Sequence, residues 1–283
     1  MFKNHTTYGK LNVKKEKIPF LVALTELDAI KTWFGGDISH SNDQVLFIKD
    51  VFSGNSNNLH LSIKKLKNSK IEWNCSFERF EILISFTCSN NTLEIEINCK
   101  EYGIDTFIQE WIYALYRLQE FVEQGKVKSP RFEYNTSDKT SILVSIEINS
   151  SSAIIFSHLT EKFYLQQIFS RYPECDLESL HYSWGWIDEG PNNLISWKRN
   201  SVLIHDFIID FNPIGYIKWD LDEISEQKCI VTLTHNDIDL EDEIHPDNAY
   251  YSYKNGWLYF LAKIRDLTEN KSFTLYFEDE LVD

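Results

Sequence analysis

The segment Trp111-Ile-Tyr-Ala-Leu-Tyr-Arg-Leu-Gln-Glu-Phe-Val-Glu123 returns in the chain as Trp257-Leu-Tyr-Phe-Leu-Ala-Lys-Ile-Arg-Asp-Leu-Thr-Glu269. Most equivalent positions hold the same residue or one of similar chemistry, and the two segments stand 146 residues apart. Solenoid repeats recur roughly every 20–50 residues, so this spacing is too long for a solenoid. The repeat instead predicts two copies of one domain.

Two shorter matches follow in the same order. Leu24-Thr-Glu26 matches Leu159-Thr-Glu161 at an offset of 135 residues, and Ile71-Glu-Trp73 matches Ile217-Lys-Trp219 at an offset of 146. The growth of the offset predicts about eleven extra residues in the second copy, between Phe169 and Ile217.

The stretch Gly125-Lys-Val-Lys-Ser-Pro-Arg131 is typical of a linker, because glycine ends a helix and proline resumes extended chain. We therefore predict a first domain at 1–126, a linker at 127–137 and a second domain at 138–283. A chain of 283 residues is long enough for two domains that each bury a core.

Composition and charge exclude several classes of protein. The chain is 43% hydrophobic and 14% aromatic, which is typical of a globular protein. Its formal charge of −15 repels phosphate, so we expect no nucleic-acid partner and no anionic membrane surface. No apolar run reaches the ~18–20 residues of a membrane span. Five cysteines without a CxxC pair, and no visible signal peptide, predict a cytoplasmic protein with reduced thiols.

The first copy reads as short helices, a meander and one long helix. We expect a strand at Tyr8–Lys14, then two short helices, the first beginning near Pro19 and the second near Thr25. Runs typical of strands follow at Val45–Lys49, Leu59–Ile63, Lys70–Cys75, Glu81–Thr87 and Thr92–Ile97. The long helix opens with the capping box Thr106-x-x-Gln109, and its apolar stripe contains Trp111, Leu115, Leu118 and Val122.

The second copy repeats this order. We expect a strand near Ile142–Ile148, a helical region over about Ser150–Phe169, aromatic strand runs from Tyr182 to Thr234, and a helix that carries Trp257. The tail Phe273–Phe277 predicts an additional edge strand.

These motifs resemble one known family. Pro19-Phe-Leu-Val-Ala-Leu-Thr25 with Trp33-Phe34 resembles the opening of the AHSA1-like branch of the START/Bet v 1-like (SRPBCC) superfamily. Ile217-Lys-Trp219, Ile230-Val-Thr-Leu-Thr-His235 and Gly256-Trp257 resemble its last strands and closing helix. The resemblance covers about 1–125 and 138–275. Glu110 and Ile168 depart from the family pattern, where a glycine and a tryptophan are expected.

The resemblance implies an α+β fold of two tandem helix-grip domains, each a curved antiparallel sheet wrapped around a long C-terminal helix. It also implies a cavity between sheet and helix, lined by aromatic side chains. The candidate ligand-binding residues are Trp73, Phe86, Trp111, Trp184, Trp197, Trp219 and Trp257. The alternative is that these side chains simply fill the cores.

Catalytic and metal-binding patterns are weak. The eight histidines show no HxxxH or HExxH spacing, and the acidic stretch Asp237–His245 lacks the glycine of a calcium loop. No nucleophile elbow or phosphate loop is present in the sequence. His205 and Asp206 are adjacent in a strand, so they should face opposite ways. We expect no catalytic residue, no metal and no cofactor.

The expected function is therefore non-catalytic binding of a hydrophobic small molecule, as a carrier or sensor. The main alternative is a protein-interaction module, such as the chaperone-associated Hsp90 activators that share the family name. A third alternative is an enzyme, which requires a polar pair inside the cavity.

Overall fold

The computed structural model describes residues 5–34, 37–42, 45–49, 59–66, 69–77, 80–99, 105–129, 140–169, 172–186, 189–238, 246–269 and 273–277. The chain divides into two compact units. The first comprises Met1–Asn135 together with Lys271–Asp283, and the second comprises Thr136–Asn270. The tail that we placed with the second domain is thus grouped with the first unit.

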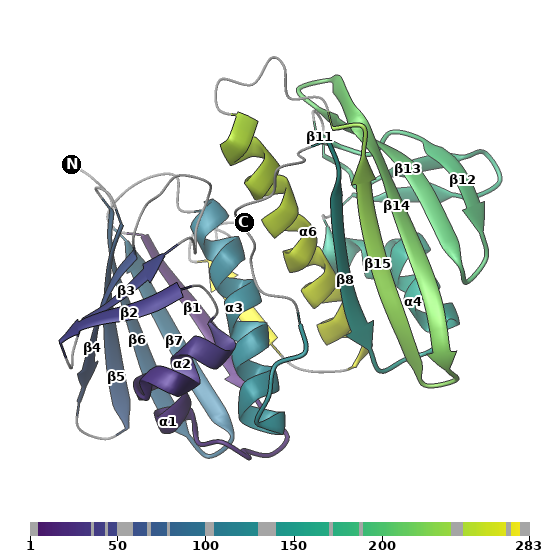
Figure 1. Cartoon of the computed structure of the whole chain (residues 1–283). Helices are drawn as coiled ribbons and strands as arrows, with labels where there is room; N and C mark the ends of the chain where they lie inside the picture. Colours follow the sequence, from purple (N-terminus) through teal and green to yellow (C-terminus); the bar gives the residue numbers. More distant parts are fainter. Residues whose placement is uncertain are drawn as a thin grey trace. The chain divides into compact units, whose positions relative to one another are not determined.

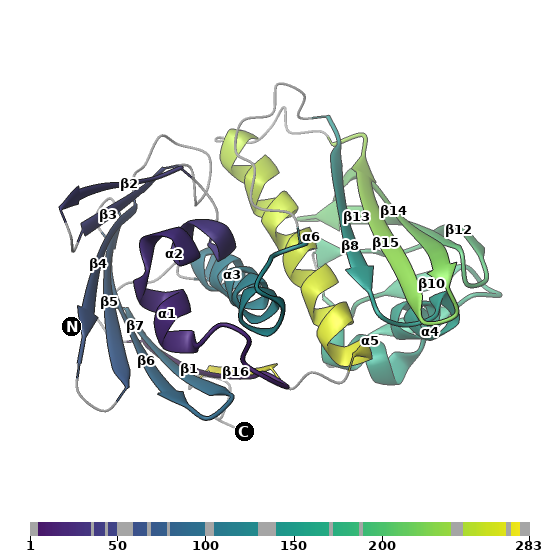
Figure 2. The ribbon, with the colours of Figure 1, turned by 60° about the horizontal axis from the view of Figure 1, so that its bottom comes forward.

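The first unit contains β1 (His5–Asn12), α1 (Phe20–Thr25), α2 (Leu27–Trp33), β2 (Asp37–Asn42), β3 (Val45–Lys49), β4 (Leu59–Lys65), β5 (Lys70–Phe77), β6 (Phe80–Ser89), β7 (Thr92–Cys99), α3 (Asp105–Gln124) and β16 (Phe273–Phe277). Its eight described strands form one antiparallel sheet in the order β16-β1-β7-β6-β5-β4-β3-β2. Figures 1 and 2 show this sheet curling around α1, α2 and α3. The predicted meander is confirmed, whereas the polar strand β2 was not predicted.

Local sequence explains the helices of the first unit. Pro19 is the N-cap residue of α1, and the extended Glu26 separates α1 from α2. Leu115, Leu118 and Val122 are fully buried on α3, as the apolar stripe predicts. The helix ends where Gly125 adopts a φ of +72° and its N–H donates to the Phe121 carbonyl.

The second unit contains β8 (Ile142–Ile148), α4 (Ser152–Thr160), α5 (Lys162–Ile168), β9 (Glu174–Asp176), β10 (His181–Ser183), β11 (Glu189–Gly190), β12 (Leu194–Lys198), β13 (Val202–Ile209), β14 (Asn212–Ser225), β15 (Lys228–Asn236) and α6 (Pro246–Thr268). Its main sheet has the order β11-β13-β14-β15-β8, with β12 also paired to β13. The predicted strand at Ile142–Ile148 and the predicted helical region before Phe169 are confirmed. Each unit is thus an antiparallel sheet with two short helices and one long helix after the meander (Figure 1).

Two pairs of equivalent contacts support the duplication. Glu123 on α3 accepts a hydrogen bond from the Lys14 N–H (3.0 Å), and Glu269, after α6, accepts one from the Asn149 N–H (2.9 Å). These residues match at the offsets of 146 and 135 that the sequence shows.

The second pair of contacts caps the short helices. Arg117 Nε donates to the carbonyl of Trp33 at the end of α2 (2.8 Å), and Lys263 Nζ donates to the carbonyl of Ile168 at the end of α5 (2.8 Å). Arg117 corresponds to Lys263 and Trp33 to Ile168 at the same two offsets. Each long helix therefore carries a cation that binds the C-terminus of a short helix.

The match of Ile71–Trp73 with Ile217–Trp219, in contrast, is wrong. Trp73 lies on β5, the third-last strand before α3, whereas Trp219 lies on β14, the second-last strand before α6. The short pattern recurs because both strands alternate toward an aromatic core.

Pairing registers give the true correspondence. Leu11 pairs with Leu93, and its equivalent Ile146 pairs with Val231. The register can be traced strand by strand, from β7 through β6 to β5 in the first unit and from β15 through β14 to β13 in the second. Trp219 then occupies the position of Phe86, and His205 the position of Trp73.

The extra residues of the second copy also lie elsewhere than predicted. Positions 86 and 219 differ by 133, and positions 93 and 231 differ by 138. The long helices differ by 146, so the additions fall in the β14–β15 hairpin and between β15 and α6. None of the net growth falls between Phe169 and Ile217, where we expected it.

Candidate ligand-binding site in the second unit

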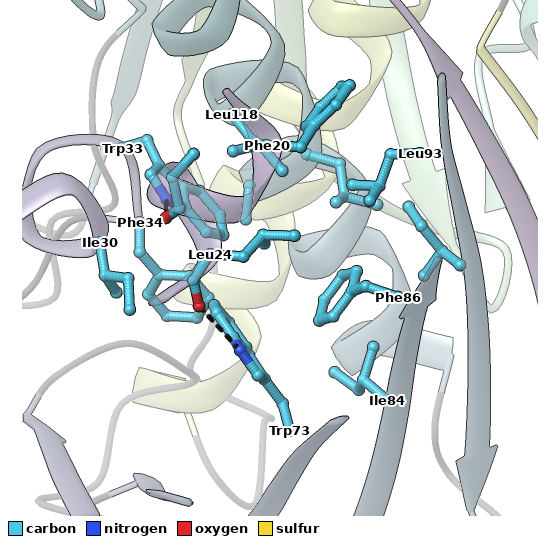
Figure 3. Packing of buried hydrophobic residues seen from close by; sticks show 14 of the residues in the cluster. Phe20, Leu24, Ile30, Trp33, Phe34, Trp73, Ile84, Phe86, Leu93 and Leu118 are labelled. Carbon is cyan, nitrogen blue, oxygen red and sulfur yellow. Dashed lines mark hydrogen bonds between the residues drawn. The ribbon is translucent and has the colours of Figure 1, made fainter. Parts of the chain in front are cut away.

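The core of the first unit is a closed aromatic stack. Trp33 and Trp73 are fully buried and stacked, with ring centroids 5.9 Å apart, and Trp73 meets Phe86 edge to face at 5.2 Å. Figure 3 shows these rings with Phe34 and Leu24. The indole N–H of Trp33 donates to the Ala23 carbonyl (2.8 Å), and that of Trp73 donates to the Leu24 carbonyl (3.1 Å). Both polar edges are therefore satisfied by helix α1.

Two buried charged residues of α3, Arg117 and Glu120, bind the segment that follows this helix. Arg117 Nη1 donates to the Ser129 carbonyl (2.7 Å). Glu120 accepts from the backbone N–H (3.0 Å) and the hydroxyl (2.8 Å) of Ser129. These bonds fasten the segment after α3 to the helix, which is a structural role.

The second unit gathers three of its predicted tryptophans. Trp184, Trp219 and Trp257 are at most 2% exposed, and Trp184 meets Trp257 edge to face at 5.9 Å. Two fully buried histidines, His205 on β13 and His235 on β15, lie among these rings. We call the rings of Tyr182, Trp184, His205, Phe207, Trp219, His235, Trp257, Phe169, Trp186 and Phe260 the aromatic–histidine cluster.

The hydrogen bonds of His205 assign its tautomer. Its Nδ1 lies 2.6 Å from the Asp206 backbone carbonyl, which only accepts, so Nδ1 carries the hydrogen. Its Nε2 then accepts the indole N–H of Trp219 at 3.1 Å. The Asp206 carboxylate faces away and accepts from the N–H groups of Asn192 (2.7 Å) and Asn193 (2.9 Å). The two adjacent side chains therefore form no acid–base pair, as their alternation predicts.

His235 takes the opposite tautomer. Its Nε2 donates to the Ile214 carbonyl (2.6 Å), and its Nδ1 accepts from the indole N–H of Trp257 (3.3 Å). Burial lowers the pKa of both histidines to about 4. Both imidazoles are therefore neutral at pH 7, with both ring nitrogens occupied.

The rings at one end of the cluster are buried, and those at the other end are partly exposed. Phe169 stacks on Trp184 at 4.1 Å with the planes 5° apart, and Trp186 meets Trp184 edge to face at 5.3 Å. Phe260 on α6 contacts Trp184, Trp186 and Phe169 at 5.7, 6.1 and 4.9 Å. Phe169, Trp186 and Phe260 are each partly exposed. They form the solvent-facing end of a continuous series of rings that reaches His235.

Gly190 shapes this end of the cluster. Its φ is +105°, and a Cβ at this position would lie 3.2 Å from Trp184 and 3.5 Å from Trp186. A side chain would therefore be both strained and crowded. Glycine here lets the backbone lie against the two indoles.

One of the predicted site residues, Trp197, lies apart from these groups. Trp197 on β12 is 38% exposed, and its indole N–H donates to the Leu177 carbonyl (3.0 Å). Its ring lies 6.5 Å from that of Phe156, which is outside the aromatic–histidine cluster. Trp111 lies on α3, but its side chain is outside the described residues.

Sequence reasoning missed the histidines, Phe207, Trp186 and Phe260 as members of the cluster. His235 stood at the end of an alternating strand, which was a usable signal for an inward-facing side chain. His205 carried no such signal, because the wrong strand correspondence hid its equivalence to Trp73.

Other chemistry is sparse in the described part of the chain. No three histidine, cysteine or acidic side chains gather there as metal ligands, and most of Asp237–His245 lies outside it. Burial raises the pKa of the Cys88 and Cys175 thiols to about 11, so neither is a thiolate at neutral pH. None of the described helices has the length and apolar character of a membrane span.

No family model and no curated protein matches the chain. Among solved structures, it is similar to DynU16, a protein of the dynemicin biosynthetic locus, with 13% identity over 93% of this chain and 98% of that chain (TM-score 0.36). An HSP90 activator from Plasmodium falciparum matches with 19% identity over 48% of this chain and 99% of its own (TM-score 0.37). The self-sacrificing resistance protein CalC from Micromonospora echinospora matches with 11% identity over 47% and 97% (TM-score 0.36). At these identities the likenesses assign no activity, and the tandem helix-grip fold rests on the topology of the chain itself.

Proposed function

We propose that the second unit binds a flat, apolar small molecule at the aromatic–histidine cluster, without catalysis, and that the first unit is a structural partner domain. The supporting observation is the gradient of rings from the partly exposed Trp186 and Phe260 to the buried Trp257 and His235. Aromatic rings supply large contact areas for a flat ligand.

The polar atoms of the cluster favour an apolar ligand. The two ring nitrogens of each histidine, the indole N–H groups of Trp219 and Trp257, and the Tyr182 hydroxyl all have protein partners. A ligand that demanded one of these groups would have to break an existing buried bond, which costs about 1–3 kcal/mol. Binding therefore depends on desolvation and ring stacking.

The two units differ in the way this proposal requires. In the first unit, Trp73 and Ile97 stand where the second has His205 and His235, and all the described rings around Trp73 are buried. We assign entry of the ligand to the end of the second unit that carries Trp186 and Phe260, with α6 or the short strand β11 moving aside.

Native mass spectrometry followed by solvent extraction tests the proposal first. A discrete mass that is lost on denaturation is the expected result. Titration with the neutral fluorophore N-phenyl-1-naphthylamine then measures affinity in wild type and in variants. Trp186→Ala and Phe260→Ala should each weaken binding about tenfold, since a stacked ring contributes about 1–1.5 kcal/mol.

Phe163→Ala is the matched control, because Phe163 is a 67% exposed ring of the same unit outside the cluster. Equal affinities in all three variants would contradict the assignment of the site. Absence of any binding by the wild type would contradict the function itself.

A second candidate function rests on a different surface. Leu180, Ile195 and Trp197 are 42%, 52% and 38% exposed, and the pairing of Leu194 N–H with the Leu180 carbonyl brings their backbones together. A protein partner would cover such a surface. Loss of a captured partner in an Ile195→Ser/Trp197→Ser variant, with the fluorophore affinity unchanged, would favour this candidate.

A further inference from the structure

Phe169 and Trp184 form a parallel stack at the partly exposed end of the aromatic–histidine cluster. Their ring centroids are 4.1 Å apart, and their planes differ by 5°. Trp186 and Trp257 meet the same indole edge to face, at interplanar angles of 79° and 67°. Trp184 is fully buried, whereas Phe169 is partly exposed. Phe169 therefore covers one flat face of a buried indole with a ring that itself reaches solvent.

The equivalent residue of the first unit is held differently. Phe34 corresponds to Phe169 at the offset of 135, and each is the C-cap residue of a short helix. Phe34 is 1% exposed, and it meets Trp73 at an angle of 59° with the centroids 6.2 Å apart. The same position of the fold is thus part of the closed core in the first unit and a partly exposed, stacked ring in the second.

The backbone at Phe169 is fixed independently of its side chain. Its N–H donates to the Leu165 carbonyl (2.9 Å), and Lys263 of α6 donates to the carbonyl of the preceding Ile168 (2.8 Å). The side chain, in contrast, packs against rings of the cluster. A change of its rotamer would uncover the flat face of Trp184 without breaking either of these backbone bonds.

We propose that this covered face of Trp184 is where the ligand binds, and that a planar aromatic ring system takes the place of the Phe169 ring there. The inference rests on the function proposed above and names the class of its ligand. A planar aromatic ring reproduces the stacking contact that Phe169 gives up, so the exchange retains the aromatic contact on Trp184. A saturated ring system of the same size is puckered and has no π face, so it binds less tightly.

Titration of the full chain with N-phenyl-1-naphthylamine tests this exchange. In Phe169→Ala the ligand displaces no stacked ring, so its affinity should rise about tenfold, opposite to the loss expected for Phe260→Ala. Phe207→Ala is the matched control, because Phe207 is a buried ring of the same cluster that meets Trp184 at 58°. It separates an uncovered stacking face from a cavity made elsewhere among the rings, and it should bind no more tightly than the wild type.

Two measurements on the wild type accompany the variants. With ring ¹³C-labelled phenylalanine, saturating ligand should move the Phe169 ring signal toward that of Phe163, which is 67% exposed, because the ring leaves the indole face. Naphthalene should displace the fluorophore at about a tenth of the concentration that decalin, its saturated analogue, requires.

Each possible outcome decides one part of the proposal. Binding by the wild type with unchanged or weaker affinity in Phe169→Ala, an equal gain in Phe207→Ala, or an unmoved Phe169 signal would overturn the assignment of the Trp184 face and leave the proposed function standing. Equal potency of naphthalene and decalin would overturn the ligand class. Absence of fluorophore binding by both the wild type and Phe169→Ala would overturn the proposed function and this inference together.

Discussion

Two indole-to-imidazole hydrogen bonds define the second unit at the scale of single residues. His205 and His235 occupy positions where the first unit has Trp73 and Ile97, so the two cores differ in having imidazoles or other side chains at these positions. Each imidazole accepts from one tryptophan and donates to one carbonyl. A buried polar pair of this kind is stable only while every donor has an acceptor. Protonation of either ring would set a new N–H against an indole N–H.

This arrangement predicts acid sensitivity of the second unit. The folded pKa of each histidine is about 4, below the ordinary 6.5, so the unfolded chain binds more protons between these values. Stability is therefore complete above pH 6.5 and falls as the pH drops toward 4, by up to about 3 kcal/mol per histidine. Urea unfolding at pH 7.5, 6.5 and 5.5 measures this loss.

A His205→Gln/His235→Gln variant should be less stable at pH 7.5 but lose less of its stability between pH 7.5 and 5.5. His181→Gln is the control, since His181 is exposed at the surface with Glu174. Identical pH profiles for the wild type and the double variant would contradict neutral buried histidines.

The hydrogen bonds donated by the indole groups should contribute measurably to the free energy of unfolding. Trp219→Phe keeps one aromatic ring but removes buried volume and leaves His205 Nε2 without its donor, so the free energy of unfolding should fall by at least about 1–3 kcal/mol. Trp197→Phe, whose indole bond is at the surface, should change it by less than about 0.5 kcal/mol. Thermal unfolding of the two variants compares them, and equal losses would show that burial of the bond is irrelevant.

At the scale of elements, the long helices organise each unit through equivalent contacts. Arg117 and Lys263 both cap a short helix, yet Arg117 is 4% exposed and also bonds Ser129, whereas Lys263 is partly exposed. The two contacts show which features of the ancestral domain were kept. They also explain why the helix repeat was the most readable part of the sequence.

The caps should differ in energy. Arg117→Met removes a buried cation and leaves the Trp33 and Ser129 carbonyls without that donor, which should cost about 2–4 kcal/mol. Lys263→Met should cost about 1 kcal/mol, because water can replace the lysine at a partly exposed carbonyl. Chemical denaturation of both variants measures the difference. A larger loss for Lys263→Met would contradict the closed packing that we assign to the first unit.

Sequence patterns predicted the individual helices and strands better than they predicted which strand of one unit is equivalent to which strand of the other. Alternation and apolar stripes were sufficient for β3, β8, β16 and the long helices, because each is a local signal. The polar β2 and the short β9 had no such signal, whereas β10, β11 and β12 fall in the region where strand runs were expected, from Tyr182 to Thr234. The false Ile-x-Trp match arose because two different strands face the same kind of core. Of the predicted site residues, the buried tryptophans of the second unit came together, but their histidine partners depend on register, which no local pattern encodes.

At the scale of the whole molecule, one domain was duplicated and the copies diverged in their interiors. The first unit keeps a closed aromatic core and takes β16 onto its sheet. The second keeps its own β8 edge and carries the graded ring cluster. The division predicts that a ligand perturbs one unit and leaves the other unchanged.

The indole N–H signals of the eight tryptophans test this division most directly. A ¹H–¹⁵N spectrum is recorded during titration of the full chain with N-phenyl-1-naphthylamine, with assignments from single Trp→Phe variants. We predict saturable shifts for Trp184, Trp186 and Trp257, with Trp33 and Trp73 unmoved. Shifts confined to Trp33 and Trp73, or to the surface residue Trp197, would contradict a ligand site in the aromatic–histidine cluster.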